Sequence, residues 1–171
     1  MSNPSDNGKP AAAEENDAGN GSGYRLETME DRVKALHDLI THKSLHDSVL
    51  LKNARLVGVG RGTTSWEVDI ETHFCNMTGN LHGGAAATIL DNLTSSAFVT
   101  LNEPGTLITS TVSRTITMTY LRPVPLYSTA RIECRVVSAG RTLVNLYGEI
   151  LVNGKVCVTC THDKAIVQSR L

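Results

Sequence analysis

Residues 76–91, Asn-Met-Thr-Gly-Asn-Leu-His-Gly-Gly-Ala-Ala-Ala-Thr-Ile-Leu-Asp, contain the pattern that decides the fold. After the two glycines, apolar residues recur at spacings of three and four, which predicts a helix with one apolar face. That face consists of Ala86, Leu90, Leu93, Ala97 and Leu101. Only Asp91 is charged between Gly83 and Leu101, so this helix is expected to be mostly buried. A buried carboxylate is costly unless it is hydrogen-bonded or used in chemistry, which makes Asp91 the first candidate functional residue.

The composition fits one domain with a sizeable core. The chain has 171 residues, of which 40% are hydrophobic and 19% charged, and its net charge is −1. The sequence has no basic stripe, so we expect no nucleic-acid or membrane-surface partner. No apolar run approaches the roughly 18 residues of a transmembrane helix.

Cysteine and histidine patterns do not predict a metal or redox site. The four cysteines lie in apolar contexts and are too few for a secreted disulfide framework, which favours a reducing compartment. Cys157 and Cys160 form a C-x-x-C pattern within an extended run, where residues three apart point to opposite faces. His42 and His46 are spaced i, i+4 on an expected first helix, but a third ligand is missing, so we interpret both as solvated.

The first 23 residues are small or polar after Met1 and are expected to form a disordered tail. Four acidic residues against one lysine oppose a mitochondrial presequence, and no apolar segment suits a secretory signal. Residues 24–168 are then expected to form a single domain with an N-terminal helix.

Periodicity predicts one further helix and six strands. The helix spans 28–45, with Thr28 as N-cap and Asp31 three residues later. Strands are predicted, from alternation and from turn residues such as Asn153-Gly154, at 53–61, 64–72, 107–121, 130–137, 143–152 and 156–167. We expect the last four strands to form an antiparallel meander that curls around the long helix, giving an α+β fold.

Motifs in order along the chain resemble one enzyme family. They are Asn-x-x-Gly-x-x-His-Gly-Gly from Asn76, Asp91, Ser113, Tyr120-Leu121-Arg122-Pro123 and Gly140-Arg141-Thr142-Leu143. From about residue 53 to 164, the chain resembles the hotdog-fold acyl-CoA thioesterases of the phenylacetate-type and thioesterase superfamily member 2 groups. The resemblance implies a hotdog fold and hydrolysis of acyl-CoA to free acid and CoA. It also implies no cofactor beyond the CoA of the substrate, and a homodimer whose dimers pair into a homotetramer.

The residues give this chemistry a physical basis. Free N–H groups at a helix N-terminus stabilise a developing oxyanion, and Gly83 lets a carbonyl approach closely. Asp91 is the charged group that could activate water. It lies eight residues past Gly83, about 12 Å along the helix, so one helix cannot place both groups on one carbonyl. Two antiparallel copies of the helix across a two-fold axis would bring them together.

The resemblance also implies a role for each matching residue. Gly83 N–H and the amide of Asn76 would polarise the thioester carbonyl. The partner subunit's Asp91 and the partner subunit's Ser113 would hold and activate the water. His82 would steady the turn and the Asn76 side chain.

Two further segments resemble those that line the CoA channel. The candidate CoA-binding residues are Tyr120, Arg122, Pro123, Gly140, Arg141 and Thr142. Arg122 and Arg141 are candidates for the nucleotide phosphates, and an equal alternative is that each is a solvated loop charge.

Parts of the sequence are also compatible with functions other than hydrolysis. A non-catalytic acyl-CoA-binding or ligand-sensing module is the main alternative, because a fold does not determine a function. Asp91 favours the enzyme. A dehydratase or hydratase would need another arrangement of histidine and carboxylate, and the sequence lacks the Gly-x-Ser-x-Gly motif of serine hydrolases. The sequence leaves the acyl group open.

The last three residues, Ser169-Arg170-Leu171, differ from the peroxisomal Ser-Lys-Leu signal by Arg for Lys. They predict import into peroxisomes through the import receptor. The alternative is a chance tripeptide and a cytoplasmic protein.

Overall fold

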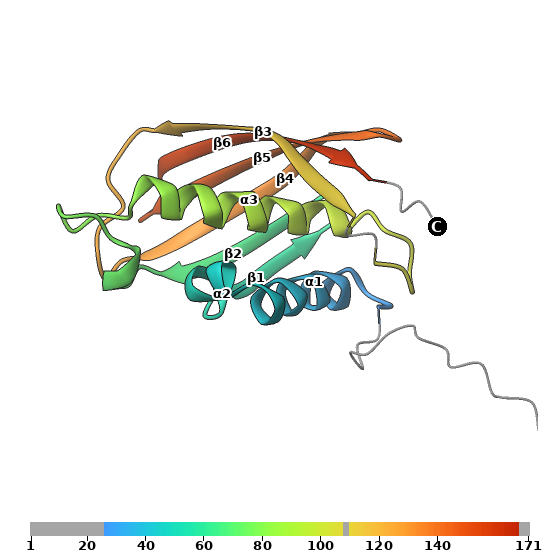
Figure 1. The fold of residues 1–171 in the computed structure, drawn as a ribbon, viewed down its shortest axis with the longest axis horizontal. Coiled ribbons are helices and arrows are strands. Elements are labelled where there is room, and N and C mark those ends of the chain that lie inside the picture. Colours follow the sequence, from blue (N-terminus) through green and yellow to red (C-terminus); the bar gives the residue numbers. More distant parts are fainter. Residues whose placement is uncertain (1–25, 108–109, 168–171) are drawn as a thin grey trace, which may run out of the picture.

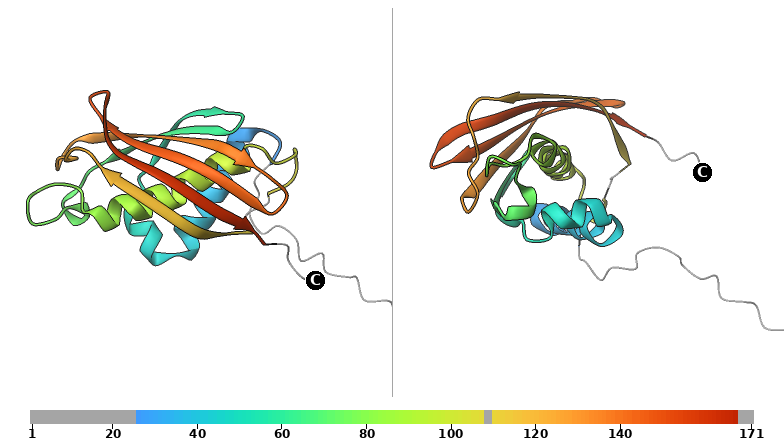
Figure 2. Two further views of the ribbon diagram at one scale, coloured as in Figure 1. Left: turned by 90° about the horizontal axis from the view of Figure 1, so that it is seen from above. Right: turned by 60° about the vertical axis from the view of Figure 1, so that its left-hand side comes forward.

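Helix α3 (Gly83–Val99) lies at the centre of the molecule, beneath a curved sheet (Figure 1). The computed structural model describes residues 26–107 and 110–167, so the predicted tail 1–23 and the tripeptide 169–171 lie outside the described residues. Figure 2 shows the sheet arching over one side of α3 while the N-terminal helices cover the other side. The predicted α+β class, with an antiparallel sheet around a long central helix, is confirmed.

The N-terminal segment forms two helices where the sequence predicts one. Helix α1 (Met29–Lys43) begins with the expected cap, in which Thr28 Oγ1 accepts from Asp31 N at 3.0 Å. Ser44 then adopts an extended backbone and caps α2 (Leu45–Leu51), a helix that the prediction missed. The i, i+4 pair predicted on one helix is therefore wrong, because His42 lies on α1 and His46 on α2.

Six strands form one antiparallel sheet in the order β1-β2-β4-β5-β6-β3. The short 3-10 helix η1 (Thr72–Phe74) leads from β2 towards α3. The strands are β1 (Arg55–Gly60), β2 (Thr63–Asp69), β3 (Thr111–Tyr120), β4 (Thr129–Ala139), β5 (Leu143–Val152) and β6 (Lys155–Ile166). All six predicted strands are present, and Asn153 and Gly154 have the positive φ angles expected of their hairpin turn.

The predicted four-strand meander is wrong in one place. β4, β5 and β6 are consecutive neighbours, but β3 pairs with β6 at the edge of the sheet. The reason is that β2 pairs with β4 from Thr63 to Asp69 and so occupies the edge of β4 that β3 would need in a meander. This topology leaves β3 as an edge strand that runs beside α3.

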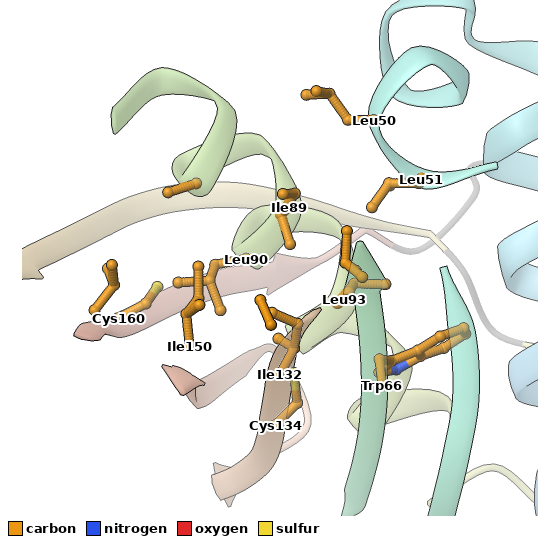
Figure 3. Close-up of a cluster of buried hydrophobic side chains, with 14 of the residues drawn as sticks. Leu50, Leu51, Trp66, Ile89, Leu90, Leu93, Ile132, Cys134, Ile150 and Cys160 are labelled. Atoms are coloured by element: carbon orange, nitrogen blue, oxygen red, sulfur yellow. The ribbon is translucent and has the colours of Figure 1, made fainter. Parts of the chain in front are cut away.

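The core lies between α3 and the concave face of the sheet. Figure 3 shows Leu90 and Leu93 of α3 extending towards Ile132 and Ile150 of the sheet. Two small polar residues of the helix are also buried and bonded. Ser96 Oγ accepts from the indole N–H of Trp66 at 3.1 Å, and Thr94 Oγ1 donates to Leu90 O at 2.6 Å. The helix is thus buried as predicted, and hydrogen bonds compensate its polar groups.

Gly148 of β5 lets the helix pack closely on the sheet. A Cβ atom at this position would lie 2.7 Å from Thr94 Cγ2 and 2.8 Å from Leu90 Cδ2. Such contacts are well inside van der Waals separation. A glycine within a strand often marks such a close approach.

Some other features of the described residues bear on function. All four cysteines are free thiols, and burial raises the pKa of Cys160 to about 12. Within 26–107 and 110–167, no group of three or more His, Cys, Asp or Glu side chains is placed to hold a metal ion. In the same part of the chain, no helix is long and apolar enough to cross a membrane.

We predict that Gly148→Ala lowers the free energy of unfolding by about 1–3 kcal/mol, because the added methyl group overpacks the contact with α3. Urea unfolding followed by circular dichroism measures this. Gly140→Ala is the matched control, since its Cβ would meet only Leu143 O at 3.5 Å. The control should change stability by less than about 0.5 kcal/mol. Equal stability of the two variants would contradict close packing at Gly148.

Candidate active site

A pocket of about 480 Å³ lies beside the N-terminus of α3. Its walls come from the loop before α3, the first turn of the helix and the segment after β3. The loop and the segment are tied together, because Leu81 N donates to Val124 O at 2.8 Å. The pocket brings together five residues that the sequence singled out, namely Asn76, Gly83, Tyr120, Arg122 and Pro123.

Gly83 is the first residue of α3 and faces Tyr120. The Tyr120 hydroxyl donates to Gly83 O at 2.9 Å. A Cβ atom at Gly83 would lie 3.3 Å from the tyrosine ring, so a side chain here would push against Tyr120. Because α3 starts at Gly83, no carbonyl of the helix receives its N–H. The Gly83 N–H is therefore a donor at the positive end of the helix dipole.

His82 and Asn76 each have a local partner. His82 Nδ1 accepts from Gly84 N at 2.9 Å, so the imidazole is the N-cap of α3. Asn76 Oδ1 accepts from the backbone N of Thr78 at 2.9 Å and from its hydroxyl at 2.6 Å. The structure thus places the imidazole of His82 at the start of the helix and the Asn76 side chain against Thr78.

A second cluster of polar side chains lies further along α3, where the helix approaches β3 and β6. Ser113 Oγ on β3 donates to Asp91 Oδ1 at 2.7 Å. His162 Nε2 on β6 is 2.9 Å from Ser113 Oγ and 3.2 Å from Asp91 Oδ1. Lys164 Nζ donates to Ser113 Oγ at 3.1 Å and lies 3.9 Å from Asp91 Oδ1. The predicted pair Asp91 and Ser113 is therefore in direct contact within one chain.

The expectation that Asp91 is buried is wrong for the single chain, because its side chain is 44% exposed. The side chain points towards β3, which is an edge strand, so no further strand covers it. The two basic partners differ in this respect. His162 is fully buried and the side chain of Lys164 is 8% exposed.

Hydrogen bonds fix the proton of His162. The hydroxyl of Thr94 donates to Leu90 O, so its oxygen accepts from His162 Nδ1 at 2.8 Å. A neutral His162 must then carry its proton on Nδ1 and present a lone pair at Nε2. Burial and the nearby Lys164 ammonium lower the pKa of His162 to about 4, only partly offset by Asp91. At neutral pH, Nε2 and Asp91 Oδ1 are thus two acceptors for one Ser113 proton.

Lys164 supplies the balancing positive charge. Burial lowers the pKa of its ammonium, and the carboxylate of Asp91 partly offsets that effect. Because the ammonium donates to Ser113 Oγ, the serine proton is directed away from Lys164 and towards the two acceptors. The cluster therefore orients Ser113 as a donor to Asp91 or His162.

The remaining predicted residues lie at the far end of the sheet. Gly140-Arg141-Thr142 form the connection between β4 and β5, where Thr142 O accepts from Ile166 N at 2.8 Å. Tyr120 pairs instead with Val158, at the opposite end of β6. One chain thus does not bring residues 140–142 to the pocket. Arg122 does line the pocket, and its guanidinium donates to Val156 O at 2.7 Å.

The sequence interpretation missed His162, Lys164 and the role of Thr94. His162 and Lys164 alternate with Asp163 on β6, so both share one face with the apolar inner side of that strand. Two basic residues on an inward strand face are a signal that was available. Thr94 gave no signal of its own, because its partner is defined only by the packing of α3 on the sheet.

Comparisons with known proteins point to one family. A family model described as Thioesterase superfamily matches residues 78–158. Acyl-coenzyme A thioesterase 13 of Homo sapiens is 31% identical over 119 residues, which cover 67% of this chain and 81% of that protein. Thioesterase superfamily member 2 from Mus musculus superposes with a TM-score of 0.67 at 26% identity, covering 79% of this chain and 97% of that one. The zebrafish protein of the same name gives a TM-score of 0.70 at 25% identity, covering 82% and 99%.

We predict that acidification destabilises the protein through His162. Between pH 6.5 and about 4, the unfolded chain binds a proton at His162 that the folded chain does not, so the free energy of unfolding falls as the pH falls through this window. The expected loss is roughly 1–3 kcal/mol, and this group contributes no pH dependence above 6.5. Urea unfolding at several pH values measures it.

His162→Gln is the control for this titration. Burial also lowers the pKa of His37, but that group contributes equally in both proteins. The difference between the two stability curves therefore isolates His162. Parallel curves across the window would show that the folded protein does not hold this imidazole neutral.

Proposed function

The chain belongs to the thioesterase superfamily, and from this premise we propose that it hydrolyses acyl-CoA thioesters to a free acid and CoA. The observation that carries the proposal is the bond between Ser113 and Asp91 beside a buried His162. This arrangement holds a half-exposed carboxylate in a fixed orientation where water can reach it. The 31% identity to a protein named acyl-coenzyme A thioesterase 13 supports the choice of substrate class.

The thioester carbonyl would bind at the N-terminus of α3. There the Gly83 N–H donates to the oxygen, and the helix dipole favours the negative charge that develops on it. The Asn76 side chain lies in the same pocket, and its Oδ1 is occupied by Thr78. Its NH₂ group is then the part of the amide available as a second donor.

Water would be activated at Asp91. One carboxylate oxygen accepts from Ser113, and the other is available to accept from a water molecule. As the water oxygen bonds to the carbonyl carbon, its proton passes to Asp91. The C–S bond then breaks, and the thiolate of CoA leaves with the proton that Asp91 took from water, which restores the carboxylate. Lys164 and His162 hold Ser113 and the carboxylate in place through these steps.

We propose that two chains share each site. Gly83 and Asp91 are about 12 Å apart along α3, too far to act on one carbonyl. The free edge of β3 supports pairing with a second copy, since unpaired backbone groups favour strand addition. Apolar side chains on β3 and just after it are exposed, including Val112, Tyr120 and Leu121. An antiparallel pair would place Gly83 of one chain near the partner's Asp91.

The CoA part of the substrate would lie over the pocket at Tyr120, Arg122 and Pro123. Arg122 is a candidate for the nucleotide phosphates, because its guanidinium is exposed on the rim. Arg141 lies at the other end of the sheet. It could serve the same substrate only from the partner chain.

We predict that Asp91→Asn lowers kcat for acyl-CoA hydrolysis by about 10²–10⁴-fold, because the amide cannot accept the proton of water. Release of CoA thiol over a series of acyl-CoA substrates measures the rate. Asp163→Asn is the matched control, since Asp163 bonds to Asn145 and lies outside the cluster. The control should keep its rate. A kcat of Asp91→Asn equal to that of the wild type would contradict the mechanism. If the wild-type protein binds acyl-CoA but releases no thiol, the non-catalytic module is favoured.

A mixing experiment tests the shared site. Asp91→Asn and Gly83→Val should each be inactive alone, because each destroys one half of every site. A dimer that contains one copy of each keeps one intact composite site, so random exchange should restore about a quarter of wild-type activity. No recovery despite proven subunit exchange would refute the shared site.

A further inference from the structure

A second groove, of about 250 Å³, begins at the cluster of Asp91 and Ser113. It lies between α1, α3 and the start of β3. Lys164 lines it, and the same ammonium contacts Ser113 at 3.1 Å. The groove therefore adjoins, through Lys164, the cluster that contains Asp91.

The lining changes from polar to apolar along the groove. Asn92 and Ser95 of α3 lie at the end near Asp91, together with Lys164. One to two turns further along α3, the lining becomes Phe98 and Val99. Helix α1 runs antiparallel to α3 (Figure 1), so Ile40 lies near the polar end and Leu36 near the apolar end. Apolar side chains thus dominate the deep end, where Thr111 at the start of β3 adds one hydroxyl group.

The groove is elongated. From Asn92 to Val99 the helix rises by about 10 Å at 1.5 Å per residue. An extended chain advances about 1.2 Å per bond, as in a polypeptide backbone, so this length holds about eight bonds. An extended alkyl chain suits such a shape better than a compact ring does.

We propose that this groove takes the acyl chain of the substrate, and that the chain is an unbranched aliphatic one of about eight to ten carbons. The inference rests on the proposed thioester hydrolysis, since the carbonyl must lie beside Asp91 for the chain to enter here. Leu36, Phe98 and Val99 determine the length by closing the deep end. Burying a charged substituent against the apolar side chains of the deep end would cost free energy, so acyl groups with a charge at their far end should be poor substrates.

The test is a chain-length series of saturated acyl-CoAs with the full-length protein, with thiol release as the readout. Each added methylene that enters the groove should raise kcat/KM about fourfold until the groove is full. We expect the increase to stop at about eight to ten carbons. Phenylacetyl-CoA should be a poorer substrate than octanoyl-CoA.

Leu36→Trp should fill the deep end and move the optimum to shorter chains, with little change for butanoyl-CoA. Leu39→Trp fills the middle of the groove and serves as a second variant if Leu36→Trp fails to fold. Leu45→Trp is the matched control, because Leu45 on α2 is 83% exposed and lies outside the groove. The control should keep the wild-type profile.

The outcomes separate the two proposals. If the wild type releases no thiol from any acyl-CoA, the proposed function fails. If the wild type releases thiol but its rate does not depend on chain length, or is highest with phenylacetyl-CoA, only the acyl groove is refuted. The same holds if neither Leu36→Trp nor Leu39→Trp changes the chain-length profile. A shift to shorter chains in the groove variants, but not in Leu45→Trp, supports it.

Discussion

The rest of the structure depends on the burial of α3 beneath a sheet that curves around it. A buried helix must satisfy every polar side chain that it carries, and α3 carries several small ones. Ser96 meets this requirement with Trp66, and Thr94 meets it with Leu90 and His162. The bond to Thr94 fixes the tautomer of His162, and His162 in turn lies against Ser113 and Asp91. The same packing that stabilises the fold therefore sets the protons of the candidate site.

In the proposed mechanism, two sites on one helix have different tasks. The N-terminus of α3 provides backbone N–H groups beside an open pocket, while the turn at Asp91 provides a carboxylate that contacts the buried Lys164 ammonium and the Ser113 hydroxyl. The two environments differ because they lie at different depths in the fold. The first is at the rim, where loops meet, and the second is where α3 crosses the inner faces of β3 and β6. Their separation along a rigid helix is the reason that the proposed mechanism needs two chains.

The elements of the fold could be predicted well from the sequence, because alternation and helical spacing are local signals. The long helix from Gly83 and the hairpin at Asn153-Gly154 are examples. The neighbour of β3 could not be predicted in this way, since strand order depends on which edges are already occupied. The break at Ser44 could not be predicted either, because this single residue both ends α1 and caps α2. At the site, Asp91 and Ser113 were found by their motif, but His162 belongs to the cluster only through strand register, which no local pattern records.

The bond from Thr94 to His162 also bears on how such a protein can diverge. The residues around Asp91 are joined to the core, so most substitutions there change stability as well as chemistry. The pocket rim at Tyr120 and Arg122 consists of exposed side chains on a segment outside the core. Substitutions of these exposed side chains are therefore expected to cost less stability than substitutions around Asp91. The fold thus separates a polar cluster that is joined to the core from a pocket rim that can be altered at lower cost to stability, so under the proposed function substrate binding could change while the cluster at Asp91 stays intact.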